Sequence, residues 1–95
     1  MSKRDDYVAN MKRQSAKWKA EIDKLDAKVQ EAKGDAKAKY QEQISALRTK
    51  YQQGETKLEA IKAAAEDSWE HLKEEVENVW EALKDSLNEF KSHFK

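Results

Sequence analysis

The chain has 95 residues, 40% of them charged, and its 19 Lys and Arg residues balance 19 Asp and Glu residues. It contains no Pro, no Cys and two Gly residues, which leaves little turn chemistry, predicts long helices and excludes disulfides and thiolate metal sites. An apolar content of 38% is low for a compact globule, and it favours an extended helical hairpin or an oligomer with a narrow buried seam.

The first third of the chain carries a heptad pattern. Apolar residues follow one another in alternating steps of three and four, with Ser15 in the gap: Val8, Met11, Trp18, Ile22, Leu25, Val29 and Ala32. This spacing is typical of a coiled-coil seam. We therefore expect a helix that begins near residue 3.

Farther along, the apolar spacing lengthens to eleven residues. One series contains Leu25, Ala36, Leu47, Leu58, Trp69 and Trp80, and a second contains Tyr7, Trp18, Val29, Tyr40 and Tyr51. An eleven-residue period corresponds to about 3.67 residues per turn, which gives a nearly straight or slightly right-handed helical path. The pattern predicts an all-α protein with one apolar stripe along almost its whole length.

The position of the helix break is less sharply marked. Gly54 is suited to the residue after a helix end, and Thr56 with Glu59 fits a capping box. We therefore predict a first helix over about 3–52 and a turn near 53–56. A turn at 64–68 is the alternative and a turn at Gly34 is a third. An unbroken helix stays open as well, because an internal Gly costs only about 1 kcal/mol.

The C-terminal helix, predicted to run to about residue 94, has a wider apolar face. Its large apolar residues are Trp69, Leu72, Val76, Val79, Trp80, Leu83, Leu87, Phe90 and Phe94. Two or more such residues per turn exceed the need of a two-stranded seam, so this helix is expected to contact two neighbours, as in a three- or four-helix bundle. The repeated Trp-Glu-x-Leu-Lys at 69–73 and 80–84 is interpreted as two turns of this face.

Charge is distributed unevenly between the two halves. Residues 1–50 carry 13 Lys and Arg against 8 Asp and Glu, whereas residues 51–95 carry 6 against 11. Opposite signs favour antiparallel packing of the halves, within one chain or between two. Individual surface pairs contribute about 0–1 kcal/mol each, so charge sets orientation more than stability.

Candidates for chemistry are few. Asp67, His71 and Glu75 share one helix face, but that face lies opposite the apolar stripe and is interpreted as a solvated charge ladder. Glu89 and His93 receive the same interpretation. Neighbouring carboxylates such as Glu74 and Glu75 point to different sides of a helix, without an apolar pocket to shift their pKa values. We expect no enzyme activity, no catalytic residue, no cofactor and no metal.

Nucleic-acid and membrane-spanning functions are also not expected. The basic residues near the start are interrupted by Asp and Glu, unlike a nucleic-acid-binding patch. The first residues lead into no apolar run, so no secretory signal is expected, and no stretch of about 18 apolar residues occurs. These features predict a soluble cytoplasmic protein.

The residues predicted to form the core or the interaction surface are large and lie on the stripe. They are Trp18, Ile22, Leu25, Tyr40, Leu47, Leu58, Trp69, Leu72, Val76, Trp80, Leu83, Leu87, Phe90 and Phe94.

Four segments carry a resemblance to a known group of proteins. KRDDYVANMK, WKAEIDKLDAK, YQEQISALR and SWEHLKEEVENVWEALKDSL, with landmarks at Tyr7, Trp18, Tyr40, Trp69 and Trp80, resemble a family of small bacterial coiled-coil proteins associated with stress responses. The resemblance implies a soluble helical bundle without catalytic residues. Members typically have small residues near the position of 65–68, whereas this chain also has Gly54.

We therefore expect a structural or protein-interaction protein that self-associates as a dimer or higher oligomer, with another helical protein as a possible partner. The alternative is reversible binding to a lipid surface through the amphipathic helix 68–94. The acidic polar face of that helix argues against anionic lipids.

Overall fold

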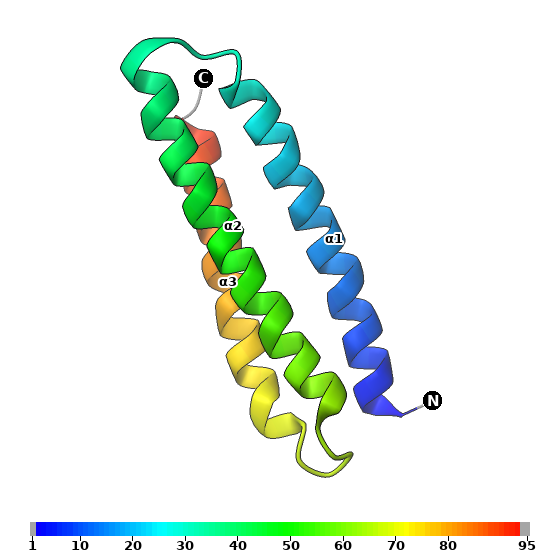
Figure 1. The fold of residues 1–95 in the computed structure, drawn as a ribbon. Helices are drawn as coiled ribbons and strands as arrows, with labels where there is room; N and C mark the ends of the chain where they lie inside the picture. Colours follow the sequence, from blue (N-terminus) through cyan, green and yellow to red (C-terminus); the bar gives the residue numbers. More distant parts are fainter. Residues whose placement is uncertain (1, 94–95) are drawn as a thin grey trace.

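Three α-helices form an up-down-up bundle in the computed structural model, which describes residues 2–93 (Figure 1). They are α1 (Lys3–Val29), α2 (Gly34–Ala63) and α3 (Glu70–His93). Helices α1 and α3 run parallel to each other and antiparallel to α2. The molecule measures 52 × 19 × 19 Å. The predicted all-α helical bundle is confirmed.

Local chemistry accounts for the start of α1. The Ser2 hydroxyl accepts a hydrogen bond from the backbone N–H of Asp5 at 3.1 Å, which satisfies one of the free donors of the first turn. Asp5 and Asp6 lie in that turn and Lys28 lies in the last one, so the charges at both ends complement the helix dipole.

The chain first reverses at residues 30–33, so the predicted continuous helix over 3–52 is wrong. The reversal is completed by Gly34, whose φ of 69° lies in the left-handed region. A side chain at that φ would be strained, whereas Gly adopts it freely. The heptad seam conceals the break because it continues on the other side of the turn in α2.

The predicted turn near 53–56 is also wrong, because α2 runs through these residues without interruption. Gly54 is buried inside the bundle, where the ring of Trp80 lies against it. Its small size serves packing between helices here, and burial of an indole outweighs the roughly 1 kcal/mol that an internal Gly costs.

The alternative turn at 64–68 is confirmed, since α2 ends at Ala63 and α3 begins at Glu70. A side chain from the start of α1 holds this connection in place. The Arg4 guanidinium donates a hydrogen bond of 2.6 Å to the carbonyl of Ala64 and lies 3.8 Å from the Glu66 carboxylate. The predicted end of α3 near residue 94 falls just outside the described residues.

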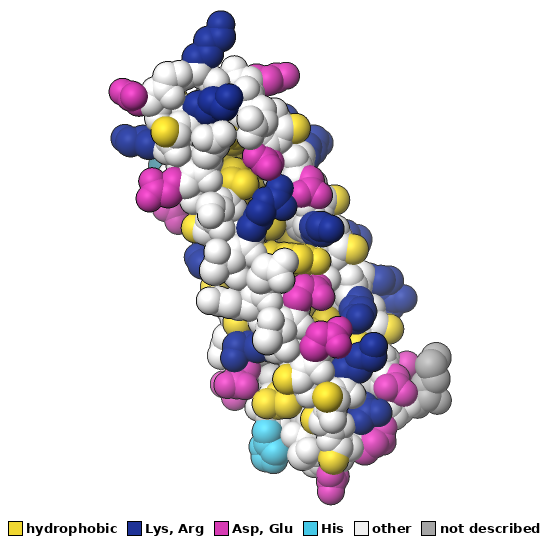
Figure 2. Space-filling model, in the orientation of Figure 1, with side chains coloured by type: hydrophobic (Ala, Val, Ile, Leu, Met, Phe, Trp, Pro, Cys, Tyr) yellow, Lys and Arg dark blue, Asp and Glu magenta, His cyan; other side chains and the backbone are white. Residues whose placement is uncertain are grey.

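Helix α3 has two neighbours, as the width of its apolar face predicted, and both belong to the same chain. The buried hydrophobic side chains form one cluster drawn from all three helices: Val8, Ile22, Leu25, Val29, Ile44, Leu47, Leu58, Ile61, Trp69, Val76, Trp80, Leu83, Leu87 and Phe90. Outside this core, charges of both signs are interspersed along the bundle, and hydrophobic atoms reach the surface between α1 and α2 (Figure 2).

Arg48 links α2 to α1. Its guanidinium lies 2.9 Å from Asp23 and 3.0 Å from Asp26, and its hydrogen bond lowers the pKa of the Asp26 carboxyl. Because all three side chains are partly exposed, each pair is worth about 0–1 kcal/mol. The contacts therefore fix how α1 and α2 align more than they stabilise the fold.

Candidate functional site

Most of the predicted interaction residues lie inside the bundle. Ten are buried: Ile22, Leu25, Leu47, Leu58, Trp69, Val76, Trp80, Leu83, Leu87 and Phe90. Trp18, Tyr40 and Leu72 are half-buried and pack against the same core, and Phe94 lies outside the described residues. The apolar stripe is therefore chiefly this chain's own core, and a partner would have to contact the outer faces.

A central aromatic layer divides the core at mid-length. The Trp80 ring packs at 4.9 Å between ring centroids from Trp18 of α1 and at 5.9 Å from Tyr51 of α2. Its six-membered ring also covers Gly54, where an added Cβ would lie 2.6 Å from the nearest indole carbon. This close approach lets the largest side chain of α3 insert between the other two helices.

Polar groups border this layer. The hydroxyl of Ser15, which is buried, donates a hydrogen bond of 2.7 Å to the Glu55 carboxylate. Burial raises the pKa of the Tyr51 hydroxyl above its usual value, and the negative charge of Glu55 raises it further. The indole N–H of Trp80 is buried without a hydrogen-bond partner among residues 2–93. An unpaired buried donor costs about 1–3 kcal/mol, so the layer combines tight packing with one unfavourable group.

Sequence reasoning assigned neither Ser15 nor Gly54 to the site. Gly54 nevertheless continues the alternating steps of four and three through Leu47, Tyr51, Leu58 and Ile61, so it occupies a seam position. This spacing could have indicated that Gly54 packs inside the bundle. The sequence instead suggested a turn there, because Gly is also a common helix terminator.

A second aromatic contact joins α1 and α3 near their first turns. The rings of Tyr7 and Trp69 are 5.4 Å apart, and the Lys73 ammonium lies 5.4 Å from the Tyr7 centroid. The Tyr7 hydroxyl donates a long hydrogen bond of 3.5 Å to the Lys73 carbonyl. Burial, followed by the nearby Glu77 carboxylate, raises the pKa of Tyr7 to about 12. Large side chains thus bridge these helices, whose backbones approach less closely than either approaches α2.

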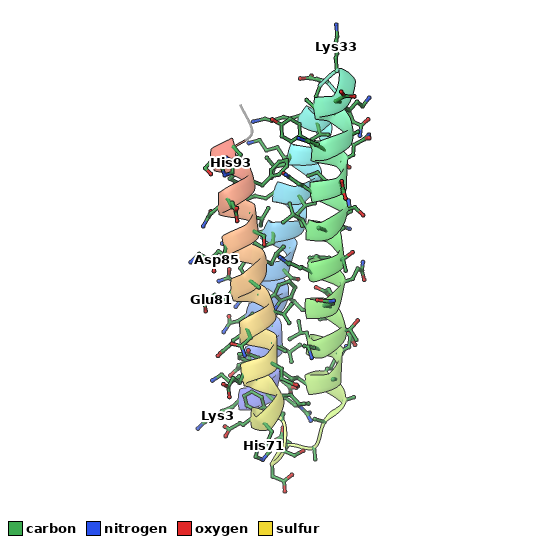
Figure 3. All side chains as sticks on the ribbon, turned by 90° about the vertical axis from the view of Figure 1, so that its left-hand side faces the viewer. Lys3, Lys33, His71, Glu81, Asp85 and His93 are labelled. Carbon is green, nitrogen blue, oxygen red and sulfur yellow. The ribbon has the colours of Figure 1, made fainter. Side chains whose placement is uncertain are left out.

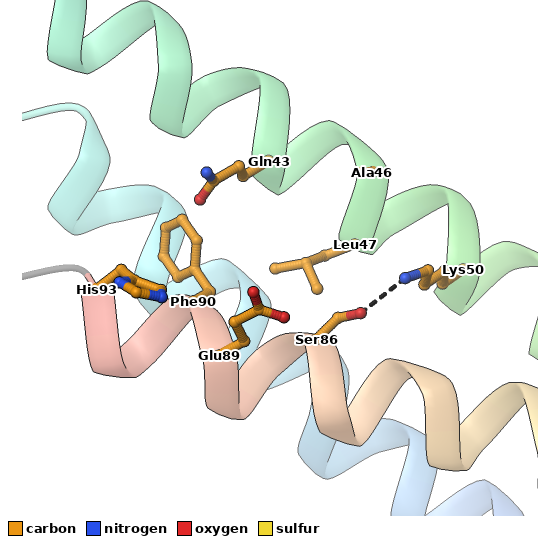
Figure 4. Close-up of a pocket in the computed structure, with 8 residues that line it drawn as sticks. All are labelled: Gln43, Ala46, Leu47, Lys50, Ser86, Glu89, Phe90 and His93. Carbon is orange, nitrogen blue, oxygen red and sulfur yellow. Dashed lines mark hydrogen bonds between the residues drawn. The ribbon is translucent and has the colours of Figure 1, made fainter.

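A hollow of about 240 Å³ lies between α2 and α3 (Figure 4). It is lined by Gln43, Ala46, Leu47, Lys50, Ser86, Glu89, Phe90 and His93. Lys50 donates a hydrogen bond of 2.6 Å to the Ser86 hydroxyl across it. Glu89 and His93, which the sequence paired, both lie here. Within the described part of the chain, no third acidic, His or Cys side chain joins them to hold a metal ion.

A second hollow of about 250 Å³ lies beside α1 and α3. Its lining residues are Glu21, Lys24, Leu25, Lys28 and Lys91. Glu21 and Lys91 form an ion pair across the two helices. The remaining lysines make this hollow basic, and a carboxylate is the chemical group that it would accept most readily.

The start of α3 separates Asp67 from His71 and Glu75, the three residues that the sequence placed on one helix face. Asp67 lies in the connection before the helix, whereas His71 and Glu75 lie on it. All three are exposed, and Glu75 faces Lys57 of α2 at 3.9 Å. Within residues 2–93, no three His, Cys, Asp or Glu side chains lie close enough together to hold a metal ion.

Comparisons with protein-family models, with curated proteins and with solved structures find no match for this chain. Among the helices of residues 2–93, none is long and apolar enough to cross a membrane. The interpretation of the site therefore depends on its own geometry.

Proposed function

We propose that this chain is a non-enzymatic structural protein that acts through self-association, as a dimer or a higher oligomer. The observation that carries the proposal is the α1/α3 side of the bundle, where Tyr7 and Trp18 are only half-buried. Aromatic side chains that retain exposed area are the residues on which protein interfaces most often depend.

The shape of the molecule supports the same role. One long side of the bundle measures 52 by 19 Å, which is comparable to the roughly 800 Å² that each partner buries in a standard interface. A bundle with charged side chains along its length can dock a second copy, or another helical protein, without rearranging its core.

Molecular mass in solution tests this proposal. We expect light scattering on the purified chain to give a mass well above the 11.1 kDa of one chain, increasing with protein concentration. Trp emission should be blue-shifted without lipid, since Trp69 and Trp80 are buried. A mass of one chain at every concentration would contradict self-association.

The resemblance of four segments to small bacterial stress-associated coiled-coil proteins supports a stress-related role in a bacterial cytoplasm. Growth of a strain that lacks this chain, compared with its parent during osmotic, acid and heat challenge, tests that role. Equal growth of both strains under every challenge would contradict it.

Reversible lipid binding is a second candidate, favoured by the unpaired indole N–H of Trp80. If α3 swung away about the 64–69 connection, its wide apolar face could enter a lipid interface, where indole N–H groups find acceptors. Neutral phosphatidylcholine vesicles are the probe, because the acidic face of α3 would be repelled by anionic lipid. Trp emission and light scattering that are unchanged by vesicles would contradict this candidate.

A further inference from the structure

We propose that two copies of this chain exchange their α1 helices, with residues 30–33 straightening so that α1 and α2 form one continuous helix. This inference rests on the proposed self-association and specifies how the two copies associate. Each α1 then packs against α2 and α3 of the other copy as it packs within one chain. The fit of the second copy follows from the fold itself, because the exchanged surfaces are those of the bundle.

The α1–α2 connection has few of the features that normally stop a helix. None of residues 30–33 has a positive φ, so α1 lacks the left-handed residue that commonly follows a helix end. Lys33, before α2, makes no side-chain cap hydrogen bond, in contrast to Ser2 before α1. Residues 30–33 are Gln, Glu, Ala and Lys, which all favour a helix. Only Gly34 opposes a continuous one.

The hydrogen bonds of residues 30–33 are all local, within the part of the chain that the structure describes. The backbone N–H groups of Gln30, Glu31 and Ala32 donate to the last turn of α1. The 64–69 connection differs, because Arg4 of α1 donates to its backbone. Straightening 64–69 would lose that contact, whereas an exchange of α1 rebuilds it between the two copies. The α1–α2 connection is therefore the easier hinge.

The apolar seam passes through this connection in the phase of a single helix. Two separate helices need no common phase across their connection, whereas one continuous helix requires it. The straightened segment therefore presents one unbroken seam to its partner. Its positions follow one another in steps of three or four residues: Val8, Met11, Ser15, Trp18, Ile22, Leu25, Val29, Ala32, Ala36, Tyr40, Ile44, Leu47, Tyr51, Gly54, Leu58 and Ile61.

The register between α1 and α2 places the two-fold axis of the exchanged dimer. Lys12 pairs with Glu59, and Asp23 pairs with Arg48, so eleven residues along α1 match eleven residues along α2 in the opposite direction. Continued for twelve more residues, this register brings residue 35 of one copy opposite residue 36 of the other. The axis therefore lies at the start of α2.

The first turns of α2 are where a second copy adds contacts. In the same register Val29 lies across from residue 42, so α2 extends beyond the end of α1, with Lys33 at the tip (Figure 3). There Ala36 is exposed although it lies on the seam, and Ala32 and Tyr40 are half-buried. In the exchanged dimer these turns pair antiparallel around the axis. The additional apolar burial offsets part of the freedom lost on association.

Cross-linking of engineered cysteines tests the exchange, because the chain has no Cys of its own. Variant K12C/E59C places thiols at facing positions of α1 and α2, and the control K57C/E75C places them at facing positions of α2 and α3. Both variants are refolded from urea at high protein concentration, and the fraction with the mass of two chains is treated with a short bis-maleimide. On denaturing gels we expect K12C/E59C as linked pairs of chains and K57C/E75C as single chains.

Substitutions at the connection should shift the exchange in opposite directions. Gly34→Ala strains the turn of the single chain and favours the continuous helix, so it should raise the dimer association constant about 100-fold or more. Lys33→Gly disfavours the continuous helix in both copies and should lower that constant about 10-fold. The control Lys39→Gly lies at an exposed position that is helical in both forms, and should leave it unchanged. Analytical ultracentrifugation measures all three constants.

The outcomes separate the exchange from self-association in general. A mass of one chain for the unmodified protein at every concentration would contradict both. A dimer in which K12C/E59C is linked only within single chains would leave self-association standing and overturn the exchange. Linked pairs from K57C/E75C would also overturn it, because α3 would then be the exchanged helix. Equal association constants for Gly34→Ala and Lys39→Gly would show that residues 30–33 do not straighten.

Discussion

The two glycines of this chain occupy opposite environments. Gly34 is exposed at the α1–α2 connection and has a φ of 69°. Beyond the adjoining backbone, no part of residues 2–93 lies within 4 Å of the position that a Cβ would take there. Gly54 is buried in the middle of α2 with helical geometry, and a Cβ there would overlap Trp80. The first glycine satisfies the backbone and the second makes space for a side chain from another helix.

This contrast explains where local sequence patterns were misleading. A Gly flanked by polar residues suggests a turn at either position, because both requirements select the same residue. Only the identity of the facing side chain separates them. At Gly34 the cost of substitution comes from conformation, and at Gly54 it comes from packing, so substitutions should distinguish the two sites.

Removal of the indole is the strongest perturbation of the Gly54 region. We expect Trp80→Ala to lower the free energy of unfolding by about 3–5 kcal/mol, since it leaves a cavity that Gly54 cannot fill. Urea denaturation at a fixed protein concentration measures the change. A loss below about 1 kcal/mol would show that the central layer collapses readily and that the contact with Gly54 is not tight.

A methyl group at Gly54 should have an effect whose sign depends on Trp80. In the unmodified chain, overpacking of the Gly54→Ala methyl group against the ring is expected to lower the free energy of unfolding by about 1–3 kcal/mol. The better helix propensity of Ala offsets about 1 kcal/mol of this loss. In a Trp80→Phe background the ring is shorter, and the same change should stabilise the chain by up to about 1 kcal/mol. Denaturation of the four chains gives the coupling, and equal effects in both backgrounds would contradict it.

Much of the fold was predictable because it depends on regular periodicity. The alternating steps through Ile22 and Leu25, and the dense apolar face around Val76 and Leu83, identified the helices and the core. The turns were harder to place because the seam register continues across residues 30–33. Gly34 was recognised only as a third possibility, since nothing local distinguishes it from Gly54.

The function was less accessible from the sequence. Periodicity shows which side chains avoid water, but it does not show whether the neighbouring helix belongs to the same chain. Trp69 and Trp80 would be buried equally well in either case. The parallel alignment of α1 and α3, which brings Tyr7 and Trp18 beside Trp69 and Trp80, was visible only in the structure.

At Gly34 the expected effect comes from the backbone conformation alone and is independent of neighbours. Gly34→Ala should lower the free energy of unfolding by about 1–2 kcal/mol, because a Cβ disfavours the left-handed region. Gly34→Asn should cost less, since Asn tolerates that conformation better than Ala does. The comparison uses urea denaturation, with Trp80→Phe as an added background. Coupling between Gly34 and Trp80 would contradict the separation of the two sites.

Alkaline pH should destabilise the two aromatic contacts, at Tyr51 and at Tyr7, and leave the turn at Gly34 unaffected. Since burial raises the pKa of Tyr51 above its usual 10.0, the unfolded chain loses this proton first. Stability is therefore fully present below pH 10 and decreases as pH rises through the higher pKa of the folded state. Denaturation midpoints across this range should decrease less steeply in Tyr51→Phe.

Tyr7→Phe removes the similar contribution of Tyr7, whose pKa of about 12 belongs to the other aromatic contact. Gly34→Ala should leave the slope unchanged, because it lies far from both hydroxyls in the chain and alters no titrating group. An unchanged slope in Tyr51→Phe would mean that the hydroxyl beside Glu55 is well solvated, and that the central layer is dry only around Trp80.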